Sequence, residues 1–126
     1  MSRRTEKVGE MLRRELAQML VLGEIRDPRL GPAANISITA VQVSADLGHA
    51  RVFFDVFGKD VARDRAAEAL NAGAARIRTI LGQRVKMRRL PNLRFEWDES
   101  IERGRRMEAL FDELAREGAD PGTEEE

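Results

Sequence analysis

Cysteine and tyrosine are absent from the 126 residues, and histidine and tryptophan occur once each. Without cysteine the chain has no disulfide, no cysteine-ligated zinc, no iron–sulfur cluster and no thiolate nucleophile. Aromatic residues make up only 5% of the sequence, which disfavours recognition of single-stranded nucleic acid by base stacking. The absence of cysteine excludes several classes of enzyme, and the scarcity of aromatic residues disfavours one mode of nucleic-acid recognition.

Long apolar runs are also absent. None approaches the roughly 18 residues that a transmembrane helix needs, so we expect no membrane association. Residues 1–16 carry charge but no following apolar segment, which excludes a secretory signal of the usual pattern. We therefore expect a cytoplasmic protein. The length is typical of one domain that can bury a core of its own.

The net charge of zero conceals two regions of opposite charge. Residues 1–97 hold 18 basic and 11 acidic side chains, a net charge of +7. Residues 98–126 hold 4 basic and 11 acidic side chains, a net charge of −7. A basic body beside an acidic C-terminal part indicates a polyanionic partner.

The positive charge is densest between residues 76 and 94, a stretch of 19 residues without an acid. Its candidate phosphate-binding residues are Arg76, Arg78, Arg84, Lys86, Arg88 and Arg89, and Arg94 completes the seven cations. A second candidate patch comprises Arg3, Arg4 and Lys7. The alternative is an ordinary solvated face, but exposed helices usually mix charges of both signs. The pattern therefore favours backbone and shape contacts to structured RNA or DNA.

The first half of the chain predicts one helix and two strands. Apolar residues at helical spacing indicate a helix over 5–22, with Thr5 as N-cap and Gly23 as the stop. Residues 35–44 read as a strand whose apolar side chains change face, so that it is either buried on both faces or bulged. Residues 50–58 read as a second strand, joined to the first as an antiparallel hairpin.

The second half predicts three helices and a strand. Helices over 62–71 and 74–83 are separated at Gly73, and where the second one ends stays open between Gly82 and Met87. Residues 93–97 alternate as a third strand. A last helix begins near Asp98, with an apolar stripe of Met107, Leu110, Phe111 and Leu114. We expect a single α+β domain over 1–117, with a small antiparallel sheet, and a disordered acidic tail over 118–126.

Catalytic and metal-binding candidates are weak. His49 lies beside Asp46 in the hairpin turn, where a surface role is the simpler interpretation. The acids Asp98, Glu99 and Glu102 suit the start of a helix better than a metal site. No phosphate-cradling glycine loop occurs. We predict no catalytic residue, no metal and no cofactor.

Four segments together resemble one known family. They are "RRTEKVGEMLRREL", "ISITAVQVSADLGHARVFFDVFG", "ALNAGAARIRTILGQRVKMRRLPNLRFEWDES" and "SIERGRRMEAL". In order and spacing they are similar to ribosome-binding factor A, a bacterial assembly factor. The resemblance implies a KH-like fold of α-β-β-α-α-β order, with helices on one face of a three-stranded sheet and a C-terminal helix. It implies a non-enzymatic ribosome biogenesis factor that binds the immature 30S subunit and its 16S rRNA, assists late maturation and 5′-end processing, and matters in the cold.

The helix break departs from the family pattern. The family's Ala-x-Gly kink falls on Gly73, Ala74 and Ala75, so that the glycine stands two residues early. We place the break at Gly73, since glycine disfavours a helix interior by about 0.8–1.0 kcal/mol. A left-handed Gly73 would make Gly73→Ala destabilising by about 1 kcal/mol or more. The freed amides beside Arg76 and Arg78 would then form a phosphate-receptive corner.

Two other functions stay open at this stage. One is a generic RNA-binding KH module. The other is a protein-interaction adaptor that acts through the acidic C-terminal part. The resemblance favours a monomer that binds the small ribosomal subunit over both.

Overall fold

The structure is a computed structural model that describes residues 3–30, 35–57 and 62–118. In chain order the elements are α1 (Arg3–Val21), the 3-10 helix η1 (Pro28–Leu30), β1 (Ile36–Val43), β2 (His49–Val56), α2 (Arg63–Ala72), α3 (Ala74–Arg84), β3 (Asn92–Trp97) and α4 (Glu99–Gly118). This order confirms the predicted α+β class and its KH-like sequence of elements. The predicted disordered tail over 118–126 lies outside the described residues, apart from the last residue of α4.

The three strands lie in the order β1-β2-β3. β1 and β2 form the predicted antiparallel hairpin, and their register shifts between Ile38 and Ala40, which confirms a bulge in β1. β3 pairs with β2 in parallel, so the expectation of an all-antiparallel sheet was wrong. The physical reason is the connection: the chain between β2 and β3 crosses over through α2 and α3 and re-enters the sheet in the same direction.

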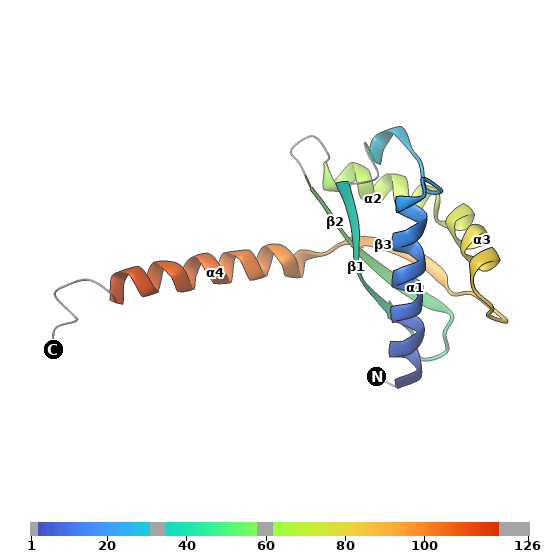
Figure 1. The fold of residues 1–126 in the computed structure, drawn as a ribbon, viewed down its shortest axis with the longest axis horizontal. Coiled ribbons are helices and arrows are strands. Elements are labelled where there is room, and N and C mark those ends of the chain that lie inside the picture. Colours follow the sequence, from blue (N-terminus) through green and yellow to red (C-terminus); the bar gives the residue numbers. More distant parts are fainter. Residues whose placement is uncertain (1–2, 31–34, 58–61, 119–126) are drawn as a thin grey trace.

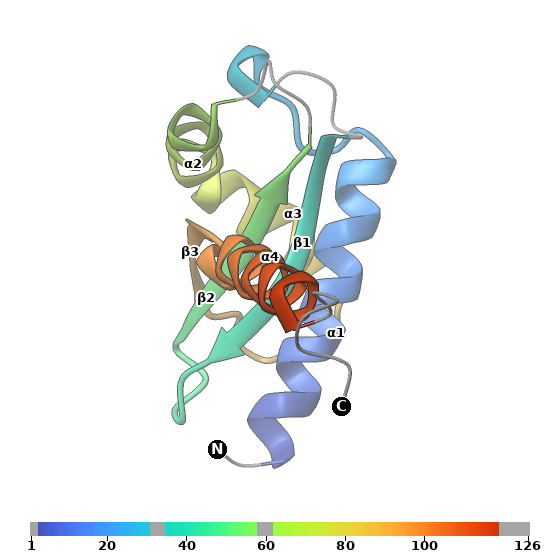
Figure 2. The same cartoon turned by 90° about the vertical axis from the view of Figure 1, so that its left-hand side faces the viewer.

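The helices α1, α2 and α3 cover one face of the sheet (Figures 1 and 2). The core lies between them, where Leu12 and Leu16 of α1 and Phe54 of β2 are fully buried. Each such side chain contributes about 1.5–3 kcal/mol when removed from water. Helix α1 approaches the sheet so closely that a Cβ on Gly9 would lie 2.5 Å from the carbonyl oxygen of Val41.

Helix α1 begins two residues earlier than expected. Thr5 is buried within its first turns, so the prediction that Thr5 caps the helix was wrong. Thr5 shares the sheet-facing side with Gly9 and Leu12 at helical spacing, and packing against the sheet extends the helix to Arg3. The predicted stop is confirmed: Gly23 has a φ of 75° just beyond the end of α1.

The break between α2 and α3 lies at Gly73, as predicted. Its φ and ψ are −95° and 6°, so the left-handed conformation considered for Gly73 does not occur. The backbone of Gly73 is instead hydrogen-bonded to both helices. Its N–H donates to Ala69 O of α2 at 3.1 Å, and its carbonyl oxygen accepts from Ile77 N–H of α3 at 2.9 Å. Ala74 and Ala75 form the first turn of α3. The open boundary at the end of α3 is settled by Val85, which is already extended.

Helix α4 stands away from the rest of the molecule (Figure 1). It leaves the sheet on the face opposite to the other helices (Figure 2). None of its residues is buried. The helix is capped by Asp98, whose carboxylate accepts the backbone N–H of Ser100 at 2.9 Å.

Candidate nucleic-acid interface

Most of the predicted basic residues gather at one end of the sheet. At this end β1 turns into β2, and β3 begins beside the turn, with Asn92 N–H donating to Gly48 O at 2.9 Å. The start of α1 reaches the same end, because Gly9 approaches Val41 and Val43 near the end of β1. We call this the hairpin end of the sheet. It joins the residues 3–7, 44–49 and 85–91, which are far apart in sequence.

The loop 85–91 supplies three exposed cations, Lys86, Arg88 and Arg89. Within the described chain none of the three forms an ion pair or hydrogen bond through its side chain. Arg78 holds this loop against α3 rather than standing free. Its Nη2 donates to Leu90 O at 2.7 Å, and its Nε lies 3.1 Å from Pro91 O. The three exposed cations therefore lie on a loop whose backbone is held in place by Arg78.

The first turns of α1 supply Arg3, Arg4 and Lys7, all exposed. Arg14 is exposed as well and lies on the same face as Arg3 and Lys7, because residues four and eleven apart share a helix face. No side-chain ion pair of Arg14 occurs among the described residues. Arg14 was not predicted from the sequence, although its helical spacing from Arg3 and Lys7 places it on their face of α1.

Arg84 serves the fold in this structure. Its Nε lies 3.0 Å from Glu15 of α1, and its Nη1 lies 2.9 Å from Glu24, just beyond that helix. The side chain is only 19% exposed. The structure thus separates the predicted residues into two groups. Arg78 and Arg84 form internal contacts, whereas the remaining predicted cations face solvent. Their role toward RNA stays a prediction.

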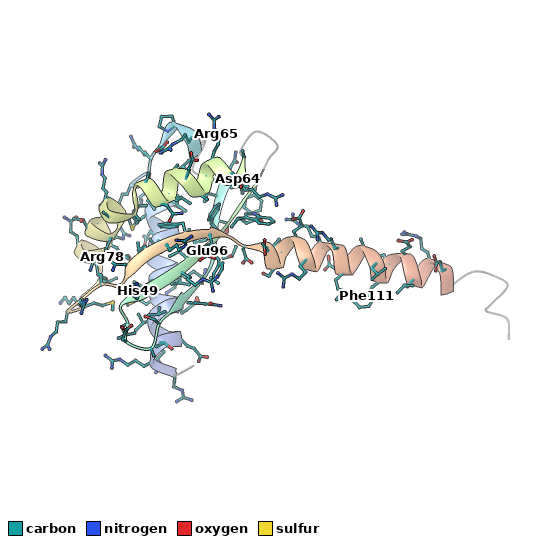
Figure 3. The ribbon with its side chains drawn as sticks, turned by 180° about the vertical axis from the view of Figure 1, so that it is seen from behind. His49, Asp64, Arg65, Arg78, Glu96 and Phe111 are labelled. Carbon is teal, nitrogen blue, oxygen red and sulfur yellow. The ribbon has the colours of Figure 1, made fainter. Side chains whose placement is uncertain are left out.

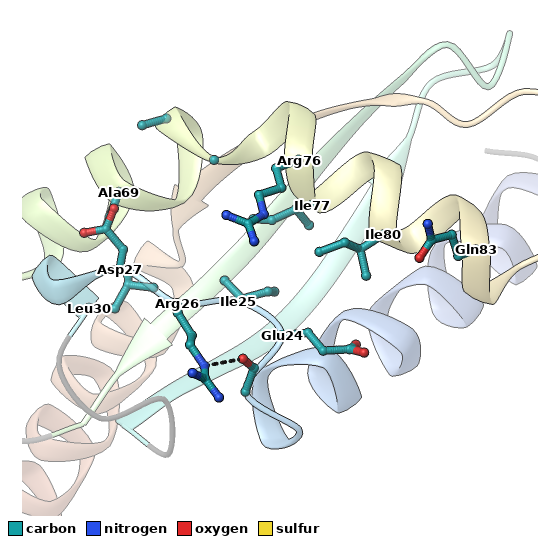
Figure 4. Close-up of a pocket in the computed structure, with 13 residues that line it drawn as sticks. Glu24, Ile25, Arg26, Asp27, Leu30, Ala69, Arg76, Ile77, Ile80 and Gln83 are labelled. Atoms are coloured by element: carbon teal, nitrogen blue, oxygen red, sulfur yellow. Dashed lines mark hydrogen bonds between the residues drawn. The ribbon is translucent and has the colours of Figure 1, made fainter.

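Arg76 lies on another side of the molecule, at the edge of a groove between the loop after α1 and the break between α2 and α3 (Figure 4). The groove has a volume of about 660 Å³. Its second cation, Arg26, donates to Gly23 O at 2.7 Å. Glu24 and Asp27 add negative charge, and a hydrogen bond from Arg29 lowers the pKa of Asp27 to about 2. Arg78 points away toward the loop, so the predicted corner keeps only Arg76.

Two acids, Glu96 on β3 and Asp46 in the hairpin turn, already form hydrogen bonds with neighbouring residues. Glu96 accepts two hydrogen bonds from Arg51 at 2.7 and 2.9 Å, which lower the pKa of this carboxyl. In the hairpin turn, Asp46 accepts a hydrogen bond from the Ser44 hydroxyl and one from the N–H of Gly48. These bonds, the one from Ser44 most of all, lower the pKa of the Asp46 carboxyl. Both acids are thus already satisfied by neighbours.

The described residues contain no cluster of histidine, cysteine, aspartate or glutamate that could hold a metal ion. His49 is exposed at the start of β2 (Figure 3). In the same described part of the chain, no helix is both long and apolar enough to cross a membrane.

Comparison with known sequences returns one consistent family. Residues 4–111 match the family model of ribosome-binding factor A. The protein named ribosome-binding factor A in Pseudomonas paraeruginosa is 44% identical over 125 residues, which cover 98% of this chain and 94% of that protein. The protein of the same name in Pseudomonas syringae is 45% identical over 111 residues, which cover 86% of this chain and 78% of that protein.

Solved structures give the same family. The crystal structure of ribosome-binding factor A from Thermus thermophilus aligns with a TM-score of 0.62 at 30% identity, covering 74% of this chain and 93% of that one. Coordinates of the Thermus thermophilus factor fitted into the cryo-EM map of its complex with the 30S subunit align with a TM-score of 0.58 at 31% identity, covering 72% of this chain and 91% of that one.

Proposed function

The chain belongs to the ribosome-binding factor A family, and we propose that it is a non-enzymatic ribosome biogenesis factor that binds the free, immature 30S subunit through 16S rRNA. In finer detail, it assists late maturation of the subunit and processing of the rRNA 5′ end, acts in the cytoplasm and matters most in the cold. The complex of the Thermus thermophilus factor with the 30S subunit supports the choice of partner.

The observation that carries the proposal is the set of free cations at the hairpin end. Lys86, Arg88 and Arg89 face solvent on a loop whose backbone is tied by Arg78. Arg3, Arg4 and Lys7 face solvent at the start of α1. Two rows of cations at one end of a small domain suit the phosphates of a structured RNA, which proteins read mainly by shape and backbone.

Absence of catalysis is part of the proposal. His49 stands exposed. Its backbone N–H donates to the Ser44 hydroxyl at 3.0 Å and its carbonyl oxygen accepts from the Ser44 N–H at 2.8 Å, whereas its ring makes no hydrogen bond in the described part of the chain. General base catalysis requires an oriented partner in a cleft, which this position lacks within the described chain. We expect His49→Ala to leave maturation of the small-subunit rRNA unchanged, and accumulation of precursor rRNA in that variant would contradict us.

Sedimentation of cell extract tests the proposal directly. The protein, located by antibody, should migrate with free small subunits and be scarce among translating ribosomes. Most of the signal at the top of the gradient, or in polysomes, would refute it. An adaptor without a ribosomal role predicts the first of these two outcomes, and a generic RNA-binding module predicts signal spread over all RNA-containing fractions.

A further inference from the structure

The second half of α4 carries an apolar stripe that nothing in the described chain covers. Met107, Leu110, Phe111 and Leu114 are between 50% and 61% exposed. They recur at i, i+3, i+4 and i+7, the spacing with which an amphipathic helix inserts into an apolar groove of another protein. Figure 3 shows Phe111 projecting from α4 far from the body of the domain.

The base of α4, by contrast, is fastened to three other elements. Asp98 accepts a hydrogen bond from Thr39 of β1 at 2.5 Å. Glu102 pairs with Arg63 of α2 at 3.2 Å, and the Arg63 guanidinium lies 3.7 Å from the ring centroid of Trp97.

A third contact of this base involves a buried acid. Arg105 approaches Asp55 of β2 at 3.7 Å, and Asp55 is only 4% exposed. Trp97 donates its indole N–H to the same carboxylate at 3.3 Å. These contacts aim the helix away from the sheet, and between residues 107 and 117 no further hydrogen bond or ion pair joins α4 to the described body. The free part extends the helix by about 18 Å.

The charge on the free part selects the kind of partner. Residues 107–118 hold four acids and one base, Arg116, a net charge of −3. At about 100° per residue, Glu108 and Glu117 flank the stripe on its two sides. Phosphates would be repelled by this segment, and two copies of it would repel each other as well. A basic protein with an apolar groove would bury the stripe and pair its positive charges with the acids on either side of it.

We propose that residues 107–117 form a docking arm whose apolar stripe binds a basic protein of the small ribosomal subunit. The basic hairpin end contacts rRNA, and the arm contacts protein at a second point, which raises the overall affinity through two linked contacts. The inference rests on the proposed function, which identifies the binding partner as the small ribosomal subunit. That the arm contacts protein rather than rRNA is inferred from α4 alone.

Photo-crosslinking on purified small subunits tests the arm. Benzoylphenylalanine replaces Phe111 in one protein and Ala109, on the opposite side of the helix, in a matched control. We expect position 111 to crosslink to a small-subunit protein, in a product that survives ribonuclease, and position 109 to crosslink several-fold less. Crosslinking of position 111 to rRNA, to the chain's own body or to a second copy would overturn the inference, as would equal products from the two positions.

A binding measurement supplies an independent readout. Leu110→Ser combined with Phe111→Ser should weaken binding to the subunit by about tenfold or more, since central apolar anchors dominate interfaces. Ala109→Ser should change nothing. Unchanged affinity in the double variant would overturn the docking arm.

The two hypotheses fail in different ways. If the unaltered protein does not bind purified small subunits at all, both the proposed function and the arm are refuted. If it binds and position 111 gives no protein crosslink, the arm alone is refuted. None of the three substituted sites, at residues 109, 110 and 111, is buried, so the body of the domain folds in every variant used.

Discussion

Arg78 and Leu90 are joined by a hydrogen bond of 2.7 Å, from the guanidinium Nη2 to the Leu90 carbonyl oxygen. The same side chain reaches the carbonyl oxygen of Pro91 through its Nε at 3.1 Å. Arg78 of α3 thereby holds the end of the loop that follows α3 against the helix itself. Arg78, which the sequence predicted to bind phosphate, instead fixes the conformation of this loop. Arg88 and Arg89 lie on the same loop.

We predict that Arg78→Ala loosens the loop before it affects the rest of the domain. Amide hydrogen exchange at residues 86–90 should accelerate, and affinity for the small subunit should fall several-fold. Because charge-assisted hydrogen bonds are lost, the free energy of unfolding should fall by about 1–2 kcal/mol. Arg78→Lys keeps the charge but lacks the forked donors, so it should not restore slow exchange. Full rescue by lysine would mean that charge alone matters here.

Arg84 and Arg14 should behave in opposite ways. Arg84→Ala leaves Glu15 and Glu24 without their partner and should lower the free energy of unfolding by about 1–2 kcal/mol. Arg14→Ala, at an exposed position, should change stability by less than about 0.5 kcal/mol and weaken subunit binding. Chemical denaturation and subunit binding measured on both variants check this pair. A destabilised Arg14→Ala, or a fully stable Arg84→Ala, would contradict the assignment.

Two glycines should respond differently to alanine. At Gly73 a Cβ would meet its nearest neighbour, Ala69 O, at 3.6 Å, an ordinary contact, and φ is negative. Gly73→Ala should therefore be neutral or stabilise by up to about 1 kcal/mol. At Gly9 the Cβ would lie 2.5 Å from Val41 O, so Gly9→Ala should destabilise by about 1–3 kcal/mol. Thermal unfolding of the two variants decides, and a reversed order would contradict the close approach of α1 to β1.

The cap of α4 should depend on acidity. Burial raises the pKa of Asp98, but hydrogen bonds from Ser100 and Thr39 outweigh it and leave the pKa below its ordinary value of 3.8. The stabilising effect of the carboxylate is thus complete above pH 3.8 and is lost as pH falls through the lowered folded-state pKa. Asp98→Ala should lower stability by about 0.5–2 kcal/mol at neutral pH. Its deficit against the unaltered protein should shrink as pH falls below 3.8 and through the lowered folded-state pKa, and a constant deficit would exclude the ionised cap.

Local patterns carried much of the fold. The apolar period of α1, the breaks at Gly23 and Gly73 and the change of face within β1 all arise from neighbours in sequence, which is why they could be predicted. Local alternation alone could not reveal the parallel pairing of β3, because apolar residues alternate in the same way in parallel and antiparallel edge strands. The length of the crossover between β2 and β3 contained that information.

Part of the candidate interface could likewise be predicted from the sequence, and part depends on tertiary packing. Density of positive charge found the loop 85–91 and the start of α1, but it could not separate free cations from engaged ones. The partner of Arg84 is Glu15, 69 residues away, and such a pairing exists only once the helices have packed. The outward stripe on α4 was predicted as an apolar face, yet nothing in its periodicity tells whether the body covers it.

The salt dependence of binding to purified small subunits tests the central claim most directly. Arg88→Gln with Arg89→Gln removes two charges at the hairpin end, and Arg65→Gln with Arg103→Gln removes two exposed charges on α2 and α4. Each phosphate contact contributes about 0.7–0.9 to the slope of log affinity against log salt concentration. We expect the first pair to reduce that slope by about 1.5 and the second pair to leave it unchanged. Equal slopes for the two pairs would contradict the assignment of RNA binding to the hairpin end.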